Sequence, residues 1–151
     1  MKLVLATQNK GKIKEIRNFL SGLKIQILTL DNFKNNFQLK ETGKTLQENA
    51  LLKTNAVYQV TKLPTLADDS GLEVKYLKGK PGVKSSRFAG EKATYLDNNL
   101  KLLKLLKDAP VKQRKAQFRC VIALKLDDKK TKILEGKISG YIATEMKGKN
   151  G

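Results

Sequence analysis

The chain has 151 residues, enough for one domain with a hydrophobic core and no disulfide bonds. Its 31 lysines and arginines against 14 acidic residues give a formal net charge of +17, and it has no histidine. The absence of histidine excludes Ser-His and Cys-His nucleophile pairs and His-ligated zinc, while carboxylates, lysines and oxygen-ligated metals remain. No apolar run approaches the roughly 18 residues that cross a bilayer, and no export signal is visible, so we expect a cytoplasmic protein without a membrane partner.

The positive charge comes mostly from lysine. Only four basic residues are arginines, and the lysines are spread through every segment. Surfaces that read bases favour arginine forks and stacking aromatic rings, so we interpret the lysines as a solvated surface without a specific nucleic-acid partner. The alternative is a lysine-rich polyanion-binding or nucleic-acid-binding module without catalysis.

The first predicted unit is a strand at residues 3–6, a polar loop and a helix. Thr7, Asn9 and Lys12 follow the strand, and the helix has apolar residues on one side at Ile13, Ile16, Leu20 and Leu23. Such a loop presents backbone N–H groups and the positive end of a helix dipole, to which these three side chains add donors. The loop therefore suits a phosphate, and a plain helix cap is the alternative.

A second strand is expected around residues 25–30, and a polar loop follows it. Glu41 lies beyond that loop. Thr45 and Glu48 form a capping box that opens a helix with one face marked by Leu46, Ala50, Val57 and Val60. Asn49 and Lys53 are four residues apart on another flank, which we interpret as solvated unless it points at the strand that carries Asp69.

The best candidate for a reaction centre is the stretch in which an apolar strand after Pro64 reaches Asp68 and Asp69. We expect Ser70-Gly71 to turn the chain there, which would put Asp69 at the mouth of the strand. Adjacent side chains of a strand point to opposite sides, so one carboxylate would face the site and the other would make a structural hydrogen bond. Asp pairs also occur simply as turn formers and caps.

The second half of the chain predicts further strands and one helix. The helix starts at a Thr94–Asp97 cap, and its leucines at 96, 100, 103 and 106 are expected to pack in the core rather than on a membrane. Cys120 is interpreted as a core residue on a strand. The expected elements are a short strand at 72–76, a turn at 79–82, long strands at 116–124 and 132–142 joined by a hairpin, and a glycine-rich loop at 144–151.

Four polar motifs lie between these elements. They are Ala6-Thr7-Gln8-Asn9-Lys10-Gly11-Lys12; Glu41-Thr42-Gly43 with Glu48-Asn49-Ala50 and Lys53; Ala67-Asp68-Asp69-Ser70-Gly71-Leu72; and Pro81-Gly82-Val83 with Ser86-Arg87-Phe88-Ala89-Gly90. Together and in this order, the set resembles the inosine/xanthosine triphosphate pyrophosphatase family over nearly all of the chain. The resemblance implies an α/β fold, an elongated mixed sheet with flanking helices in two lobes around a central cleft. It also implies a homodimer and a single pyrophosphatase domain over residues 1–151.

The family hydrolyses inosine, deoxyinosine and xanthosine triphosphates to the monophosphate and pyrophosphate with Mg²⁺, which removes deaminated purines from the nucleotide pool. By resemblance, Glu41 and Asp69 bind the metal, and Asp69 is also the proton acceptor. The expected substrate-binding residues are Thr7, Asn9, Lys12, Lys53 and Ser70. Asp68 is expected to be an auxiliary acid.

The chain departs from the family pattern after Gly151. In the family a Phe-Gly-Tyr-Asp segment, a lysine and a Ser-His-Arg motif follow, and they hold the base and part of the phosphate chain. We therefore interpret the sequence as C-terminally truncated and expect low turnover with little preference among purine bases.

Overall fold

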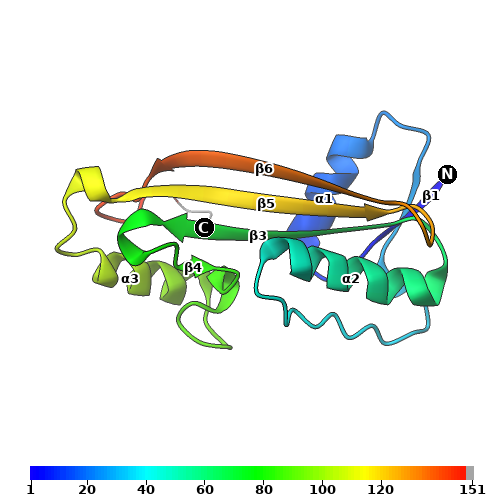
Figure 1. Cartoon of the computed structure of the whole chain (residues 1–151), viewed down its shortest axis with the longest axis horizontal. Coiled ribbons are helices and arrows are strands. Elements are labelled where there is room, and N and C mark those ends of the chain that lie inside the picture. Colours follow the sequence, from blue (N-terminus) through cyan, green and yellow to red (C-terminus); the bar gives the residue numbers. More distant parts are fainter. Residues whose placement is uncertain (149–151) are drawn as a thin grey trace. The chain divides into compact units, whose positions relative to one another are not determined.

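A computed structural model of the chain describes residues 1–148 (Figure 1). Up to β5 its longer elements alternate between strands and helices, and β6 follows β5 directly, as the sequence predicts. The last three residues of the glycine-rich loop expected at 144–151 lie outside the described residues. The helices are α1 (Lys10–Leu20), α2 (Leu46–Thr61) and α3 (Tyr95–Leu105), and the strands are β1 (Lys2–Leu5), β2 (Gln26–Leu28), β3 (Thr65–Val74), β4 (Pro81–Gly82), β5 (Lys115–Lys125) and β6 (Thr131–Tyr141).

The strands of the described residues form one sheet in the order β2-β1-β3-β5-β6, with β4 paired to β3. Strand β1 is parallel to both β2 and β3, whereas β4 is antiparallel to β3. The expected α/β fold with a mixed sheet is therefore confirmed. Within the part of the chain that the structure describes, no helix is long and apolar enough to cross a membrane.

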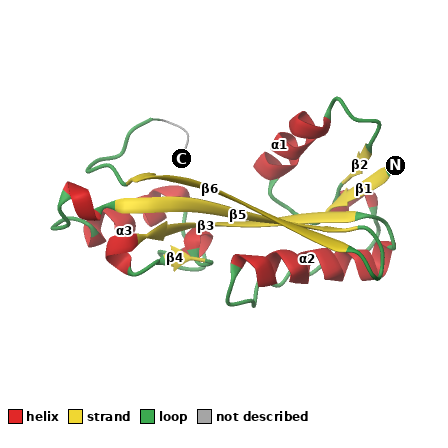
Figure 2. Ribbon diagram, turned by 45° about the horizontal axis from the view of Figure 1, so that its top comes forward, coloured by secondary structure: helices red, strands yellow, loops and turns green. Residues whose placement is uncertain are grey.

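The contacts of the chain group into two compact units. The first contains residues 1–69 and 121–134, and the second contains residues 70–120 and 135–151. In the first unit, α1 and α2 lie on opposite sides of β3 (Figure 2), and the core includes Val4, Leu30, Phe37, Val57 and Ala67. The core of the second unit forms around Val74, Leu102, Leu106, Ala109 and Ala116.

Each helix begins after a polar capping residue, and the caps of α2 and α3 are the threonines that the sequence predicts. Asn9 caps α1, and Thr45 Oγ1 accepts a hydrogen bond from the Glu48 N–H at the start of α2. Thr94 and Asp97 bond each other reciprocally at the start of α3. These local bonds satisfy N–H groups that have no partner inside a helix, which is why short sequence motifs locate the helix starts well.

The predicted turn at Ser70-Gly71 is wrong, because β3 continues through both residues to Val74. The added length is held by a partner strand, since Leu72 and Glu73 pair with Gly82 and Pro81 of β4. Ser85 Oγ also accepts a hydrogen bond from the Leu72 N–H at 2.8 Å. Asp69 consequently lies in the middle of a ten-residue strand rather than at its mouth.

The buried face of β5 changes along the strand. Ala116 is buried as the alternation predicts, but Phe118 is 55% exposed and Cys120 is only half-buried, so the predicted core position of Cys120 is wrong. Beyond Cys120 the buried residues are Val121, Ala123 and Lys125. These have odd numbers whereas Ala116 has an even number, so the other face of the strand is buried there. The change coincides with the boundary between the two units, so each unit buries its own set of side chains.

The leucine stripe of α3 packs only in part. Of the four predicted leucines only Leu106 is buried, whereas Leu103 is half-buried and Leu96 and Leu100 are each about half exposed. Leu102, which is not in the predicted stripe, is buried. The C-terminal end of this helix is fixed by Arg114, which is 3% exposed. Its guanidinium donates hydrogen bonds to the carbonyls of Leu106 (2.7 Å), Ile142 (2.9 Å) and Ala143 (2.7 Å). One buried cation thus joins the end of α3 to the segment after β6.

Replacing Arg114 by alanine should lower the free energy of unfolding by about 3 kcal/mol, because carbonyl groups bound to a buried charge would lose their donor. Urea unfolding followed by circular dichroism measures this change. The exposed neighbour Lys112 supplies the control, since Lys112→Ala should change stability by less than about 0.5 kcal/mol. Equal effects of the two substitutions would contradict the structural role of Arg114.

Candidate functional site

The candidate site lies on β3 just past the end of β1. The two strands pair at Val4 with Thr65 and at Leu5 with Leu66, and the Ala6 N–H donates to the Leu66 carbonyl at 2.8 Å. After Ala6 the chain leaves the sheet and enters α1. A crevice beyond the carboxyl end of a parallel strand is a common ligand site in α/β proteins. Asp68 and Asp69 follow directly on β3.

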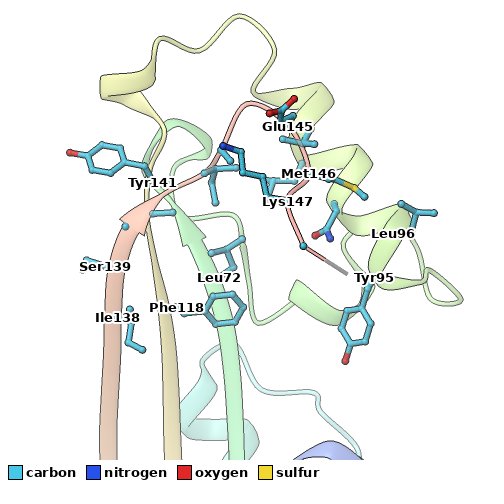
Figure 3. A pocket seen from close by; sticks show the side chains of 18 residues that line it. Leu72, Tyr95, Leu96, Phe118, Ile138, Ser139, Tyr141, Glu145, Met146 and Lys147 are labelled. Carbon is cyan, nitrogen blue, oxygen red and sulfur yellow. The ribbon is translucent and has the colours of Figure 1, made fainter. Parts of the chain in front are cut away.

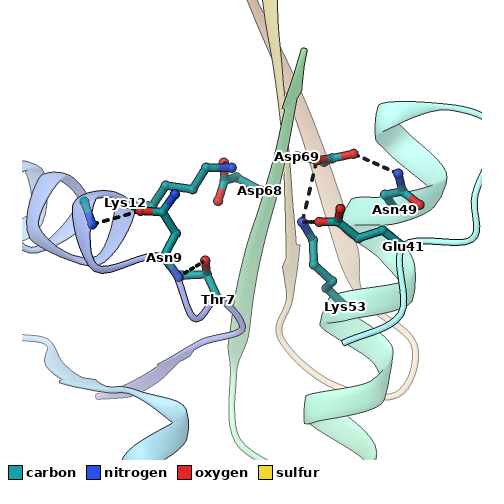
Figure 4. Close-up of polar contacts among 9 residues, drawn as sticks. Thr7, Asn9, Lys12, Glu41, Asn49, Lys53, Asp68 and Asp69 are labelled. Atoms are coloured by element: carbon teal, nitrogen blue, oxygen red, sulfur yellow. Dashed lines mark hydrogen bonds and ion pairs between the residues drawn. The ribbon is translucent and has the colours of Figure 1, made fainter. Parts of the chain in front are cut away.

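On the α1 side of β3 lie Thr7, Asn9, Lys12 and Asp68 (Figure 4). Asn9 Oδ1 accepts hydrogen bonds from the N–H groups of Gly11 (2.9 Å) and Lys12 (3.2 Å), so Asn9 is a helix cap. Thr7 Oγ1 accepts from the Asn9 N–H at 3.2 Å. The loop is therefore held in shape by its own side chains, while the first turn of α1 carries no acidic residue to offset its positive end.

Asp68 is tied to this loop by an ion pair. Its Oδ2 lies 2.6 Å from Lys12 Nζ, and the side chain of Asp68 is almost fully buried. Its second oxygen, Oδ1, is the only buried side-chain polar atom among the described residues without a hydrogen-bond partner. A buried oxygen of this kind is costly unless a ligand or water satisfies it.

The α2 side of β3 holds Glu41, Asn49, Lys53 and Asp69. Lys53 Nζ lies 2.7 Å from Glu41 Oε1 and 3.7 Å from Asp69 Oδ1, and Asn49 Nδ2 donates to Asp69 Oδ2 at 3.0 Å. Asn49 is fully buried and Lys53 is 5% exposed. The solvated interpretation of this helix flank is therefore wrong, because the flank faces the Asp69 strand.

The opposite directions of Asp68 and Asp69 confirm the strand rule applied to the sequence. Asp68 contacts a lysine from α1, and Asp69 contacts a lysine from α2 (Figure 4). Each carboxylate is thus balanced by the ammonium group of a different helix. The sequence motif that contains the two acids creates two separate polar clusters, one on each side of a single strand.

Asn49 is the residue whose importance sequence reasoning missed. The sequence places it on a helix flank and in a motif without indicating a site residue. Its Oδ1 accepts a hydrogen bond from the Gly43 N–H at 2.8 Å while its Nδ2 binds Asp69. The available signal was its four-residue spacing from Lys53, which places both on one side of α2.

The electrostatics of the α2-side cluster favour a proton acceptor at Asp69. Burial raises the pKa of the Asp69 carboxyl above its ordinary value, and the nearby Glu41 carboxylate adds to this rise. The Asn49 hydrogen bond and the Lys53 and Lys12 charges oppose it. The net effect is a raised pKa, which makes Asp69 a stronger base than an exposed aspartate.

The same cluster fits a hard divalent cation. Glu41 and Asp69 each bring a carboxylate oxygen to one cationic group, the Lys53 ammonium. Among residues 1–148 no three histidine, cysteine or acidic side chains gather as an all-protein cage. Mg²⁺ is commonly bound by one or two carboxylates with substrate phosphates and waters, so this pair of acids suits it.

Two further sequence candidates lie outside these clusters. Ser70 follows Asp69 in β3, is half-buried and belongs to the second compact unit. Arg87 ends a short 3₁₀ helix (Ser85–Arg87), and its Nε lies 3.7 Å from Oε1 of the exposed Glu91. The Glu91 contact assigns no chemical role to Arg87.

The second unit contains an apolar groove of about 660 Å³ (Figure 3). It lies between α3, β5 and β6, and its lining includes Leu96, Leu103, Phe118, Ile138 and Tyr141. Glu145 and Lys147 are its charged lining residues. The groove therefore has no pair of carboxylates, unlike the α2 side of β3, where Glu41 and Asp69 lie close to one lysine.

Comparison with known proteins places the chain in a family. The family model of the Ham1 family matches residues 3–151. The dITP/XTP pyrophosphatase of Thermoanaerobacter pseudethanolicus is 46% identical over 151 residues, covering all of this chain and 76% of that protein. The corresponding protein of Vibrio cholerae is 45% identical over 152 residues, covering 99% of this chain and 76% of that protein.

Solved structures agree with this result. A HAM1 protein from Coxiella burnetii matches with a TM-score of 0.91 at 40% identity, and the Staphylococcus aureus Ham1 protein matches with 0.88 at 38%. Both alignments cover the whole of this chain and 77% of the other. The chain belongs to the Ham1 family, and the resemblance inferred from its motifs is confirmed.

Asp69→Asn should raise the free energy of unfolding at pH 7 in metal-free buffer. The pKa of Asp69 in the folded state lies above its ordinary value of 3.8. Asp69 therefore lowers the free energy of unfolding of the unsubstituted chain at pH values above the raised pKa, and it has no such effect below pH 3.8. The stability difference between Asp69→Asn and the unsubstituted chain should shrink as the pH falls from above the raised pKa to 3.8. Urea unfolding over a pH series with a chelator tests this, with the exposed Asp31→Asn as control. Lower stability of Asp69→Asn at pH 7 would contradict the pKa direction.

Proposed function

We propose that this chain is a nucleoside triphosphate pyrophosphohydrolase for deaminated purine nucleotides such as ITP, dITP and XTP. The observation that carries the proposal is the α2-side cluster, in which buried Asp69 lies beside Lys53 and Glu41. Asp69 is on β3, and the other side of this strand faces the α1 loop. The dITP/XTP pyrophosphatases that match the whole chain support this substrate class.

The phosphate chain binds at the α1 loop in this proposal. Thr7 and Lys12 donate from the loop, and the N–H groups of the Asn9 amide remain available because its Oδ1 is used in the cap. Asp68 acts as an auxiliary acid by holding the Lys12 ammonium at the loop. Ser70 and Lys53 are the further proposed substrate contacts.

Glu41 and Asp69 are the proposed Mg²⁺ ligands, since their carboxylate oxygens already approach one cation. When bound, Mg²⁺ supplies positive charge that offsets the negative charge developing on the phosphate oxygens. Lys53 supplies a second positive charge from α2. Its burial keeps this charge close to the carboxylates and away from bulk water.

Asp69 is the proposed proton acceptor. Its raised pKa suits removal of a proton from a water molecule, whose oxygen forms a bond to the α-phosphorus of the nucleotide. The bond from that phosphorus to the oxygen of the β-phosphate then breaks, and pyrophosphate leaves with the electron pair. The products are a nucleoside monophosphate and pyrophosphate.

The remaining parts of the proposal concern the whole chain. Residues 1–151 would act as one pyrophosphatase domain, and the protein would form a homodimer in the cytoplasm without a specific nucleic-acid or membrane partner. The family match over residues 3–151 supports a single functional domain. Sedimentation analysis at several concentrations tests the dimer.

Product analysis gives the sharpest test of the reaction. Incubation of the chain with ITP and Mg²⁺ should give inosine monophosphate and pyrophosphate in equal amounts, which ³¹P NMR distinguishes from the diphosphate and phosphate. Formation of inosine diphosphate would contradict attack at the α-phosphorus. Duplex DNA binding tighter than about micromolar at physiological salt, without any effect of nucleotide, would instead favour a polyanion-binding module.

Asp69→Asn should abolish hydrolysis with the fold intact, because an amide neither accepts the proton nor binds Mg²⁺ well. Asp68→Asn should have a milder effect, since it weakens only the attachment of Lys12. Because Asp68 acts on the phosphate-binding loop and not on the base, Asp68→Asn should slow ITP hydrolysis and ATP hydrolysis to the same extent. Initial rates with both nucleotides measure this. Equal losses in the two variants would refute the division of roles.

A further inference from the structure

We propose that Asn49 is a positioning residue that holds the Glu41 and Asp69 carboxylates in a fixed arrangement on the α2 side of β3. The inference rests on the proposed function, in which these two carboxylates bind the metal. Asn49 itself touches neither substrate nor metal in this proposal. It acts through two other segments of the chain, the Glu41–Gly43 segment and strand β3.

The geometry shows one side chain bonded to both segments. Asn49 Nδ2 donates to Asp69 Oδ2 at 3.0 Å, and Asn49 Oδ1 accepts from the Gly43 N–H at 2.8 Å. The side chain has no solvent exposure, so water cannot substitute for either bond without a rearrangement. A buried amide with both ends satisfied is rigid, and its loss removes one hydrogen bond from the Asp69 carboxylate and one from the Gly43 N–H.

The amide can adopt only one orientation here. A flipped side chain would place Oδ1 against the Asp69 carboxylate and the NH₂ group against the Gly43 N–H. Both contacts would be repulsive. The Asp69 carboxylate therefore accepts the Asn49 hydrogen bond with Oδ2, and its Oδ1 lies 3.7 Å from Lys53 Nζ.

Gly43 fits the same arrangement because it lacks a side chain. A Cβ atom at this position would lie 2.7 Å from Glu48 Cβ, 2.8 Å from Asn49 Oδ1 and 3.0 Å from the Asn49 backbone nitrogen. The Glu41–Gly43 segment thus packs directly on the first turn of α2. Glu41 is only two residues away, so the docking of Gly43 limits where its carboxylate can lie.

The test measures binding of Mn²⁺ alone, by electron paramagnetic resonance, to the purified chain without nucleotide. The variants are Asn49→Ala and Gly43→Ala, and the control is Asn55→Ala, which makes the same change at an exposed position of the same helix. Each of the two test variants should weaken Mn²⁺ binding by about ten-fold or more, as loss of a group that orients metal ligands does. Asn55→Ala should match the unsubstituted chain.

Circular dichroism confirms that each variant is folded before binding is measured. If Asn49→Ala does not fold, Gly43→Ala decides, since it keeps the asparagine and displaces only the docked segment. Folded variants that bind Mn²⁺ within two-fold of the unsubstituted chain would show a purely structural role and overturn the inference. Absence of Mn²⁺ binding by the unsubstituted chain would be a different result, because it would refute the proposed metal site itself and the inference with it.

Discussion

The placement of two adjacent carboxylates on one buried strand is the constraint on which the site depends. Neither Asp68 nor Asp69 can be removed from water without a counter-charge, because an isolated buried carboxylate is very unfavourable. The fold meets this requirement with Lys12 from α1 and Lys53 from α2. The two helices that cover β3 therefore also supply the positive charges that lie beside its two carboxylates.

The two units of the chain differ in what they offer a ligand. The first unit has two buried carboxylates on β3 paired with lysines, whereas the second unit has an apolar groove with aromatic and aliphatic walls beside its own ion pairs. The separation of polar chemistry from apolar contact surface is common in enzymes, which position the reacting groups on a rigid scaffold and use apolar area for binding.

Local motifs in the sequence predicted the helix starts, the mixed α/β class and the opposite directions of Asp68 and Asp69. These features depend on short-range chemistry, such as Thr94 bonding Asp97, or on strand geometry. The burial of Asn49 and Lys53, the continuation of β3 past Gly71 and the change of buried face in β5 depend on partners far along the chain. A single sequence gives no direct signal for those partners, so the interpretation of each residue in isolation was incomplete or wrong.

The four-residue interval between Asn49 and Lys53 limits which length changes α2 can tolerate. Both residues reach Asp69 only because positions four apart lie on one side of a helix. One inserted residue between them would turn one side chain away from the other by about 100°. Variants with insertions or deletions are therefore expected to retain this interval within α2.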